Sequence, residues 1–237
     1  MQELLSLVRR CVEDYNMIED GDKIAVGVSG GKDSLTLLCV LRKLADFFPK
    51  RFEIVAITLD MGYNANFSPV AALCREIDVE YHIIPTNIKE VIFDIRNESN
   101  PCSLCAKMRR GALHEAAISL GCNKVALGHH SDDVLETFML SLIYEGRVNC
   151  FMPTTYLDRK KITMIRPMLY VPENKVRCIV KKLALPVVHN PCPANGNSKR
   201  QEIKDLIYSL DKKYKGFKVR LFGAIQRYPL KGWEKQP

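Results

Sequence analysis

The chain has 237 residues, 47% of them hydrophobic, and a formal net charge of +8 at pH 7. This is enough for one sizeable core with a small appendage, and no apolar run reaches the ~18 residues of a membrane span. The first 15 residues have the pattern of an amphipathic helix rather than a signal peptide. Together with nine cysteines, this pattern predicts a cytoplasmic protein kept in a reducing compartment.

Short apolar stretches alternate with helical patterns along the whole chain. We expect strands at 23–28, 52–59, 79–84, 124–128, 162–166 and 186–189. We expect helices at 1–15, from Asp33, at 68–76, 88–96, 104–120, 134–144 and 173–183, and from Ser198, where Gln201 completes a capping box. The alternation predicts an α/β fold with a doubly wound parallel sheet. Segments that follow strands (29–34, Asp60, 128–129 and 190–195) should therefore meet at one edge, where such sheets bind ligands.

Residues 29–34 read SGGKDS between the first strand and the next helix. The glycines let backbone N–H groups turn inward, and the helix N-terminus adds unpaired donors and partial positive charge. Together with Lys32 and the hydroxyls of Ser29 and Ser34, these groups suit a phosphate chain. The spacing matches neither GxxxxGK[ST] nor GxGxxG. A strand-to-helix turn without a ligand is the alternative interpretation.

Three cysteines stand in loops. Cys102 and Cys105 have CxxC spacing where a loop enters a helix, which favours thiolate, and Cys192 lies between two prolines. Three interpretations are open: a zinc site with His189 as the fourth ligand, a redox dithiol that carries a persulfide, or an iron–sulfur cluster on three cysteines. The other six cysteines lie in apolar surroundings, typical of core positions.

Residues 128–133 read GHHSDD after a strand. Either Asp133 caps the following helix together with Glu136, or one of Asp132 and Asp133 holds Mg²⁺ or positions a substrate base. Gly128 would let the backbone approach a nucleotide.

The helix after CxxC carries Lys107, Arg110 and His114 at positions i, i+3 and i+7. This basic face either contacts a phosphate or is simply solvated. Arg166, at the end of a strand, either reaches a phosphate or pairs with a surface carboxylate.

The chain resembles the tRNA 2-thiocytidine synthetase family of PP-loop ATP pyrophosphatases from about residue 23 to 210. The resemblance rests on SGGKDS, CSLCAKMRRG at 102–111, ALGHHSDD at 126–133, IRPM at 165–168 and the late Cys-Pro at 192–193. It implies that ATP with Mg²⁺ adenylates the C2 oxygen of a tRNA pyrimidine, and that sulfur carried on a [4Fe–4S] cluster then displaces AMP. The paired zinc fingers of the related thiouridylases are missing from this sequence.

The resemblance also implies residue roles. The cluster ligands would be Cys102, Cys105 and Cys192. The nucleotide-binding residues would be Ser29, Gly30, Gly31, Lys32, Asp33, Ser34, Leu59, Gly128 and Asp133, and the catalytic residues Asp132, Asp133, Lys107 and Arg110. The expected partners are tRNA, a sulfur donor (a cysteine desulfurase or free sulfide) and a second copy of the chain, with no membrane. The alternatives are a metal-independent adenylating ligase of lysidine-synthetase type and a non-catalytic nucleotide- or RNA-binding module.

The last 26 residues are strongly basic. From Lys212 onward there are eight Lys or Arg residues and one Glu, with aromatic residues between them. We therefore divide the chain into a PP-loop domain with its N-terminal helix at 1–211 and a basic tail at 212–237. The tail either binds an RNA backbone with exposed bases or is a solubilising terminus that never orders.

Overall fold

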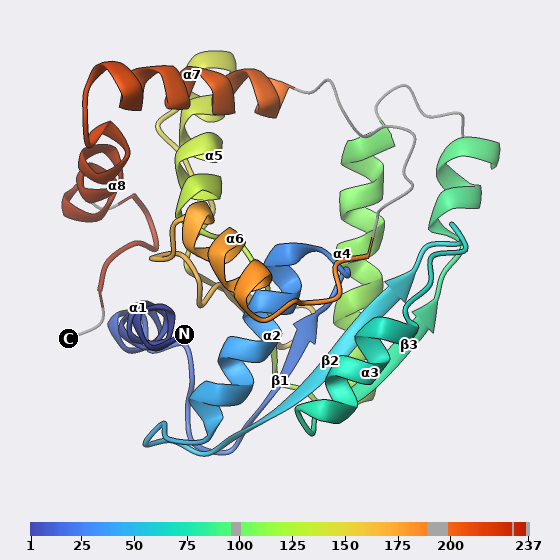
Figure 1. Ribbon diagram of the computed structural model, residues 1–237. Helices are drawn as coiled ribbons and strands as arrows, with labels where there is room; N and C mark the ends of the chain where they lie inside the picture. Colours follow the sequence, from blue (N-terminus) through green and yellow to red (C-terminus); the bar gives the residue numbers. More distant parts are fainter. Residues whose placement is uncertain (96–100, 189–198, 229, 236–237) are drawn as a thin grey trace.

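A computed structural model describes residues 1–95, 101–188, 199–228 and 230–235 (Figure 1). The strands are β1 (Asp22–Gly27), β2 (Phe52–Asp60), β3 (Glu80–Pro85), β4 (Lys124–Ala126), β5 (Thr154–Leu157) and β6 (Ile162–Ile165). The α-helices are α1 (Gln2–Asp14), α2 (Lys32–Ala45), α3 (Ser68–Glu76), α4 (Pro101–Ser119), α5 (Ser131–Tyr144), α6 (Glu173–Lys182), α7 (Lys199–Lys213) and α8 (Phe217–Arg227), and a π-helix, η1, spans Glu90–Ile95.

The six strands form one sheet in the order β3-β2-β1-β4-β6-β5. Every neighbouring pair is parallel except β5 and β6, which run antiparallel. The predicted doubly wound α/β fold is therefore confirmed, with the correction that the sheet is mostly rather than wholly parallel. The sequence analysis missed β5 because it is a four-residue edge strand.

Helices cover both faces of the sheet, and the side chains of β1 show why. Ile24 and Val26 join a core with α1, α2 and α6, whereas Ala25 between them joins a second core with Leu113 and Ala117 of α4. Successive strand residues point to opposite faces, so a strand buried on both sides must be apolar throughout. The arrangement puts the start of α2 and the inner face of α4 at the carboxyl ends of the central strands.

Two predicted elements differ from the structure. Residues 186–188 form no strand. Instead, the Val188 N–H donates a single hydrogen bond to the Gly30 carbonyl (2.9 Å). The helix expected over 88–96 is the π-helix η1. The predicted loop at 190–195, with Cys192, and the cap at Ser198 lie outside the described residues, as does His189.

The predicted tail is folded where the structure describes it. α7 continues to Lys213, α8 follows, and Trp233 is 1% exposed in the same core as α1. The Trp233 indole packs edge-on against Tyr15 and Phe222, and its N–H donates to the Phe151 carbonyl (3.0 Å). The interpretation of a terminus that never orders is therefore wrong for these residues, because their aromatic side chains complete the core. In the part of the chain that the structure describes, no helix has the length and apolar character needed to cross a membrane.

Candidate functional site

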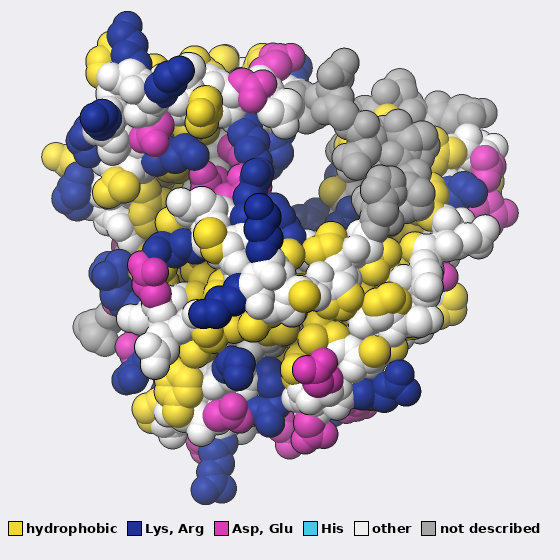
Figure 2. Space-filling view, in the orientation of Figure 1, with side chains coloured by type: hydrophobic (Ala, Val, Ile, Leu, Met, Phe, Trp, Pro, Cys, Tyr) yellow, Lys and Arg dark blue, Asp and Glu magenta, His cyan; other side chains and the backbone are white. Residues whose placement is uncertain are grey.

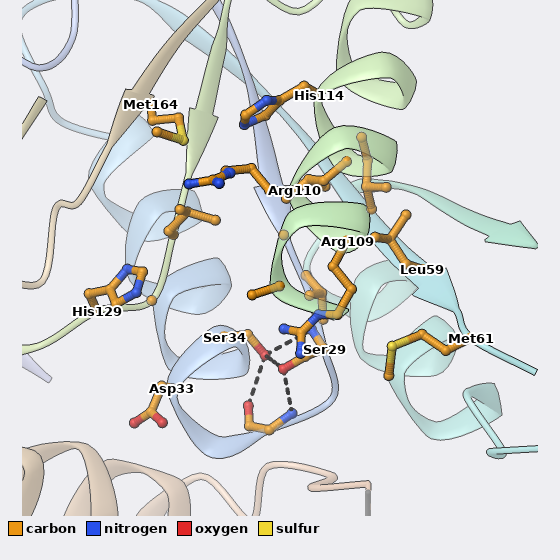
Figure 3. A pocket seen from close by; sticks show the side chains of 18 of the residues that line it. Ser29, Asp33, Ser34, Leu59, Met61, Arg109, Arg110, His114, His129 and Met164 are labelled. Carbon is orange, nitrogen blue, oxygen red and sulfur yellow. Dashed lines mark hydrogen bonds between the residues drawn. The ribbon is translucent and has the colours of Figure 1, made fainter. Parts of the chain in front are cut away.

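One cavity of about 690 Å³ lies at the carboxyl edge of the sheet, where β2, β1, β4 and β6 end side by side (Figure 3). Its size falls within the ~300–1,000 Å³ typical of small-molecule sites. The cavity is lined by residues that follow these strands, which confirms that 29–34, Asp60 and 128–129 share one edge. Eight predicted site residues line it: Ser29, Gly31, Asp33, Ser34, Leu59, Arg110, Gly128 and Asp133.

The SGGKDS loop forms the floor of the cavity and is held by its own hydrogen bonds. The Ser34 hydroxyl accepts from the Ser29 N–H (3.2 Å) and donates to the Gly31 carbonyl (2.9 Å). Gly30 has φ +79°, a left-handed conformation that glycine adopts without strain. Gly31 is the N-cap of α2 and has no side-chain cap, so the first N–H groups of the helix remain free for an anion.

Gly128 closes over this loop. A Cβ at position 128 would lie 3.0 Å from the backbone carbon of Asp33 and 3.2 Å from the Ser34 nitrogen. Backbone atoms cannot yield as a flexible side chain can, so only glycine lets β4 approach the phosphate loop this closely. Gly128 thus allows close approach to the phosphate loop, and its predicted approach to a nucleotide stays a prediction.

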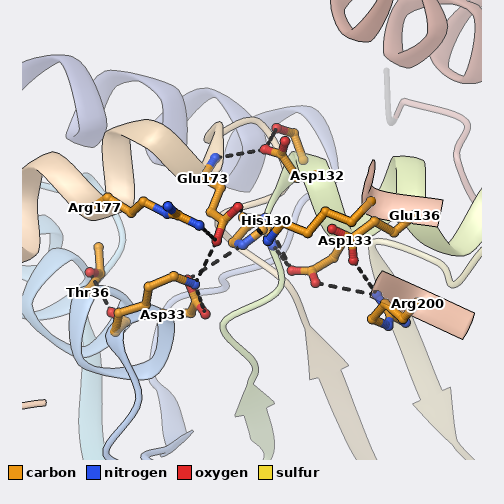
Figure 4. A network of polar contacts seen from close by, with 12 residues as sticks. Asp33, Thr36, His130, Asp132, Asp133, Glu136, Glu173, Arg177 and Arg200 are labelled. Carbon is orange, nitrogen blue, oxygen red and sulfur yellow. Dashed lines mark hydrogen bonds and ion pairs between the residues drawn. The ribbon is translucent and has the colours of Figure 1, made fainter. Parts of the chain in front are cut away.

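Lys32 does not line the cavity. Its Nζ lies 2.8 Å from Asp33 Oδ2 and 3.2 Å from Glu173 Oε1. Burial lowers the pKa of Lys32, but the hydrogen bond to Asp33 and the two carboxylate charges outweigh burial and leave the pKa above its usual value. Glu173, which the sequence analysis did not identify, also pairs with Arg177 and Lys204 (Figure 4).

The two neighbouring carboxylates, Asp132 and Asp133, have different surroundings. Asp133 lines the cavity, accepts the His130 N–H (2.9 Å) in a capping box, and lies 3.6 Å from Arg200. Asp132 does not line the cavity. It accepts the backbone N–H of Glu173 (2.8 Å) and pairs with Lys218 of α8 (2.7 Å). These contacts tie α6 and α8 to α5 and favour a structural role for Asp132, whose predicted catalytic role stays a prediction.

The His130 ring lies between two of the three carboxylates that line the cavity. Its ring nitrogens lie 3.6 Å from Asp33 and 3.3 Å from Asp133, and its side chain is 4% exposed. Asp33 belongs to the phosphate loop and lies in the first turn of α2, whereas Asp133 lies in the first turn of α5. The two carboxylates therefore come from different helices. Two carboxylates beside a phosphate site are suitable ligands for Mg²⁺.

The predicted cysteine pair lies on the first turn of α4. Cys102 is exposed and Cys105 is partly buried, and both thiols are free. Neither lines the cavity, but Ala106 and Arg109, on the following turn, do. Free thiols at i and i+3 on a helix N-terminus suit two ligands of a cluster. Among the described residues no group of three metal-binding side chains is found, so the third ligand, Cys192, stays a prediction.

The predicted basic face of α4 is split by the fold. Arg110 and His114 line the cavity, whereas Lys107 is exposed and does not. His114 is 4% exposed, and burial lowers its pKa, as do the nearby charges of Arg110 and Lys160. Figure 3 shows Arg110 reaching from α4 toward Met164.

The β6 side of the cavity carries polar groups that the sequence analysis did not place together. Arg166 is 7% exposed, and its guanidinium lies over the Phe151 ring, 4.9 Å from the centroid. The His129 ring lies 4.9 Å from the same ring. Burial, followed by the Arg166 charge, lowers the pKa of His129 to about 4, so this histidine is neutral at pH 7. Both line the cavity, as does Arg109.

Figure 2 shows a hollow beside α5 and α7, with Lys and Arg side chains along the α7 margin. Arg200 and Lys204 of α7 belong to the polar network of this margin. They pair with Asp133, Glu136 and Glu173, so α7 is connected by charge to the residues around the phosphate loop.

Comparison with known proteins agrees with this geometry. Residues 4–209 match the PP-loop domain family. The chain is 38% identical to the tRNA-cytidine(32) 2-sulfurtransferase of Teredinibacter turnerae over 225 residues, covering 93% of this chain and 74% of that protein. It is 39% identical to the enzyme of the same name from Geobacter sulfurreducens over 228 residues, covering 94% and 89%.

A solved structure is similar over almost the whole chain. The U34-tRNA thiolase NcsA from Methanococcus maripaludis, determined with its [4Fe–4S] cluster, superimposes with a TM-score of 0.77 at 27% sequence identity. The match covers 96% of this chain and 78% of the thiolase. The NAD synthetase of Campylobacter jejuni, with a TM-score of 0.52 at 14% identity, shares the fold.

Proposed function

The chain belongs to the PP-loop family, among the tRNA-cytidine(32) 2-sulfurtransferases, and on this basis we propose that it exchanges the C2 oxygen of a tRNA cytosine for sulfur at the expense of ATP. One observation carries the proposal. A single cavity joins the phosphate loop, the carboxylate of Asp133 and the inner face of α4, and two free thiols lie one turn beyond it on the same helix.

The first step is adenylation. The phosphates of ATP would lie against Ser29, Gly31 and the N–H groups at the start of α2, and Asp33 with Asp133 would hold Mg²⁺. The C2 oxygen of the base attacks the α-phosphate, an O–P bond forms, and pyrophosphate leaves. Lys32 lies at the start of α2 and pairs with Asp33, so its positive charge would help to neutralise the departing pyrophosphate.

The second step breaks the C2–O bond, and AMP leaves as sulfur bonds to C2. Cys102 and Cys105, together with the predicted ligand Cys192, would hold a [4Fe–4S] cluster beside α4, and this cluster would carry the sulfur that the donor supplies. Arg109 lies on the next turn of that helix and lines the cavity, where it would stabilise the phosphate of AMP.

The tRNA would approach through the hollow of Figure 2, with its phosphates along the basic margin of α7. The target base must leave its stack to enter the cavity, which favours a tRNA loop over a helix. The proposal includes a cysteine desulfurase or free sulfide as the sulfur donor and a homodimer as the functional form.

The test starts with the chain purified without oxygen and assayed for iron, sulfide and zinc. It is then incubated with ATP, Mg²⁺, sulfide and an anticodon stem-loop RNA, and pyrophosphate release and the RNA mass are followed. We expect about four irons per chain, RNA-dependent pyrophosphate release and one oxygen-to-sulfur exchange in the RNA.

The variants Cys102→Ser and Cys105→Ser distinguish the alternatives. We expect both to lose sulfur transfer while they retain ATP binding. If both variants kept full activity on RNA, the chain would be a metal-independent ligase of lysidine-synthetase type. ATP binding without pyrophosphate release in the wild type would indicate a non-catalytic binding module, and stoichiometric zinc would contradict the cluster.

A further inference from the structure

The cavity extends to both sides of the phosphate loop. The loop follows β1, with β2 on one side of that strand and β4 and β6 on the other. In Figure 3, Leu59 and Met61 lie on one side of Ser29 and Ser34, and His129 lies on the other. We call the two sides the β2 arm (Leu59, Met61, Tyr63 and Phe67) and the β6 arm (Arg110, His114, His129, Phe151, Met164 and Arg166).

The two arms differ in chemistry. The β2 arm is mostly apolar, and its first residue, Leu59, is a predicted nucleotide contact, so this arm suits the adenosine of ATP. The β6 arm contains two guanidiniums, those of Arg110 and Arg166. Among the described residues, neither lies within ion-pair distance of a carboxylate. Both guanidiniums line the same cavity, and burial lowers the pKa of Arg166, to which the Arg110 charge adds.

The Arg166 guanidinium is hydrogen-bonded to the protein through one of its nitrogens and carries further N–H donors. Its NH1 group donates to the Met152 carbonyl and lies 3.4 Å from the Thr155 hydroxyl. Among the described residues its buried Nε has no partner, and neither has the buried Nδ1 of His129. Burying a guanidinium without a carboxylate partner costs folding free energy, unless a ligand supplies hydrogen-bond acceptors to it. The β6 arm is therefore suited to a ligand that presents hydrogen-bond acceptors.

The identity of the acceptor follows from the fact that arginine can only donate hydrogen bonds. Cytosine presents two adjacent acceptors, O2 and N3, whereas uracil presents an N3–H donor between its two oxygens. A guanidinium can donate hydrogen bonds to both O2 and N3 of cytosine. It cannot bond to N3 of uracil, because that nitrogen is itself a donor. The neutral His129 ring can accept from the N4 amino group of cytosine.

We propose that the β6 arm is the pocket for the target base, and that Arg166 selects cytosine over uracil by donating to N3 and O2. The proposal rests on the proposed function, because it takes the acceptor to be a tRNA pyrimidine. It gives the two arms separate ligands, adenosine in one and the target base in the other, with the α-phosphate between them.

The experiment measures binding, so it does not need the cluster. Labelled anticodon stem-loop RNAs with cytosine or uracil at position 32 are titrated with the protein in the presence of a non-hydrolysable ATP analogue. We expect the wild type to bind the cytosine RNA about tenfold more tightly, the difference that one mismatched buried hydrogen bond makes.

Two substitutions at one position test the donor argument. Glutamine can donate and accept, so Arg166→Gln should bind the two RNAs within about twofold of each other. Lysine can only donate, so Arg166→Lys should retain a preference for cytosine. The exposed Lys43→Gln on α2 is the control and should match the wild type.

Arg110→Gln provides a second variant should Arg166→Gln fail to fold, because Arg110 is exposed on α4. We expect this variant to bind both RNAs more weakly, with little effect on the affinity for ATP.

Equal binding of the two RNAs by the wild type would overturn the proposal, even if the cytosine RNA is thiolated. A loss of ATP affinity in Arg166→Gln would also overturn it, because the β6 arm would then hold adenosine. A cytosine preference without any pyrophosphate release would instead refute the proposed function alone.

Discussion

The phosphate loop and the β6 arm lie in one cavity but are built in opposite ways. The loop consists of six consecutive residues, and its hydroxyls, amides and carbonyls bond mainly to one another. The β6 arm takes its side chains from α4, the end of β4, the segment before β5 and the end of β6, and two of its buried nitrogens have no partner among the described residues. A site made from one segment is complete before its ligand arrives, whereas a site assembled from several segments depends on the packing behind it.

The largest effect on turnover is expected from substituting Asp133, which differs from its neighbour Asp132 in facing the cavity. Asp133→Asn can still accept the His130 N–H, so the capping box should persist. The variant loses the charge facing Mg²⁺, so we expect turnover to fall by about 10²–10³-fold with stability close to wild type. Steady-state pyrophosphate release and thermal unfolding measure the two quantities.

Asp132→Asn is the matched comparison. It weakens the ion pair with Lys218 and the hydrogen bond from the Glu173 N–H, so we expect a stability loss of about 1–3 kcal/mol. Turnover of the folded fraction should stay within about tenfold. If Asp132→Asn abolished turnover without loss of stability, Asp132 would be catalytic and the structural assignment would be wrong.

The second prediction concerns the packing behind the β6 arm. Trp233 is buried and donates to the Phe151 carbonyl, so Trp233→Ala removes a large side chain directly behind that arm. We expect a loss of about 3–5 kcal/mol in the free energy of unfolding, measured by urea denaturation. Tyr228→Ala, at a position that is 82% exposed, is the control and should change stability by less than about 0.5 kcal/mol.

Below the unfolding transition, Trp233→Ala should affect the two parts of the cavity differently. Affinity for the ATP analogue should stay near wild type, because the phosphate loop holds itself together. The preference for cytosine RNA should fall, because Phe151 positions both Arg166 and His129. An equal loss of both properties would show that the loop also depends on the C-terminal segment.

The third prediction tests the approach of β4 to the phosphate loop. Gly128→Ala places a Cβ against the backbone of Asp33 and Ser34, so the loop must shift. We expect ATP affinity to fall by about tenfold, or ~1.4 kcal/mol, in equilibrium binding. Gly111→Ala on α4 meets nothing within 4 Å and should leave ATP affinity unchanged while stabilising the helix by up to ~1 kcal/mol. Wild-type affinity in Gly128→Ala would show that the loop tolerates the displacement.

The same contrast explains what could be predicted from the sequence. The strand, loop and helix around SGGKDS are contiguous, so periodicity and glycine placement were sufficient to predict them. Asp132 and Asp133 could not be separated, because one residue turns a helical side chain by about 100° and only the packing of α6 and α8 shows which one faces the cavity.

The β6 arm could not be predicted because no local pattern joins Phe151 to Arg166 and His129. The strand pairing that brings them together involves β5, whose four residues give too short a periodic signal. α8 was hidden in a segment whose charge suggested a tail, although Trp233 within it is almost completely buried. Charge along a helix describes its exposed face and says little about the face that packs.

The smallest expected effect is on the pH dependence of stability. It comes from Glu173, the carboxylate that pairs with Lys32 of the phosphate loop. Burial raises the pKa of Glu173, but hydrogen bonds from Lys204, Arg177 and Lys32 outweigh burial and lower the pKa from 4.5 to about 2. The unfolded chain therefore takes up this proton at a higher pH than the folded chain does. The stabilisation from Glu173 is complete above pH 4.5 and is lost as the pH falls from 4.5 toward 2.

Glu173→Gln should remove this contribution, so its free energy of unfolding should vary less steeply with pH between 4.5 and 2 than that of the wild type. Urea denaturation at a series of pH values measures the slope. Glu115→Gln, at an exposed carboxylate that pairs with Lys160, should retain the wild-type slope. If the wild-type and Glu173→Gln curves stayed parallel through this window, the three cations would not hold the carboxylate ionised, and Lys32 would owe its position to Asp33 alone.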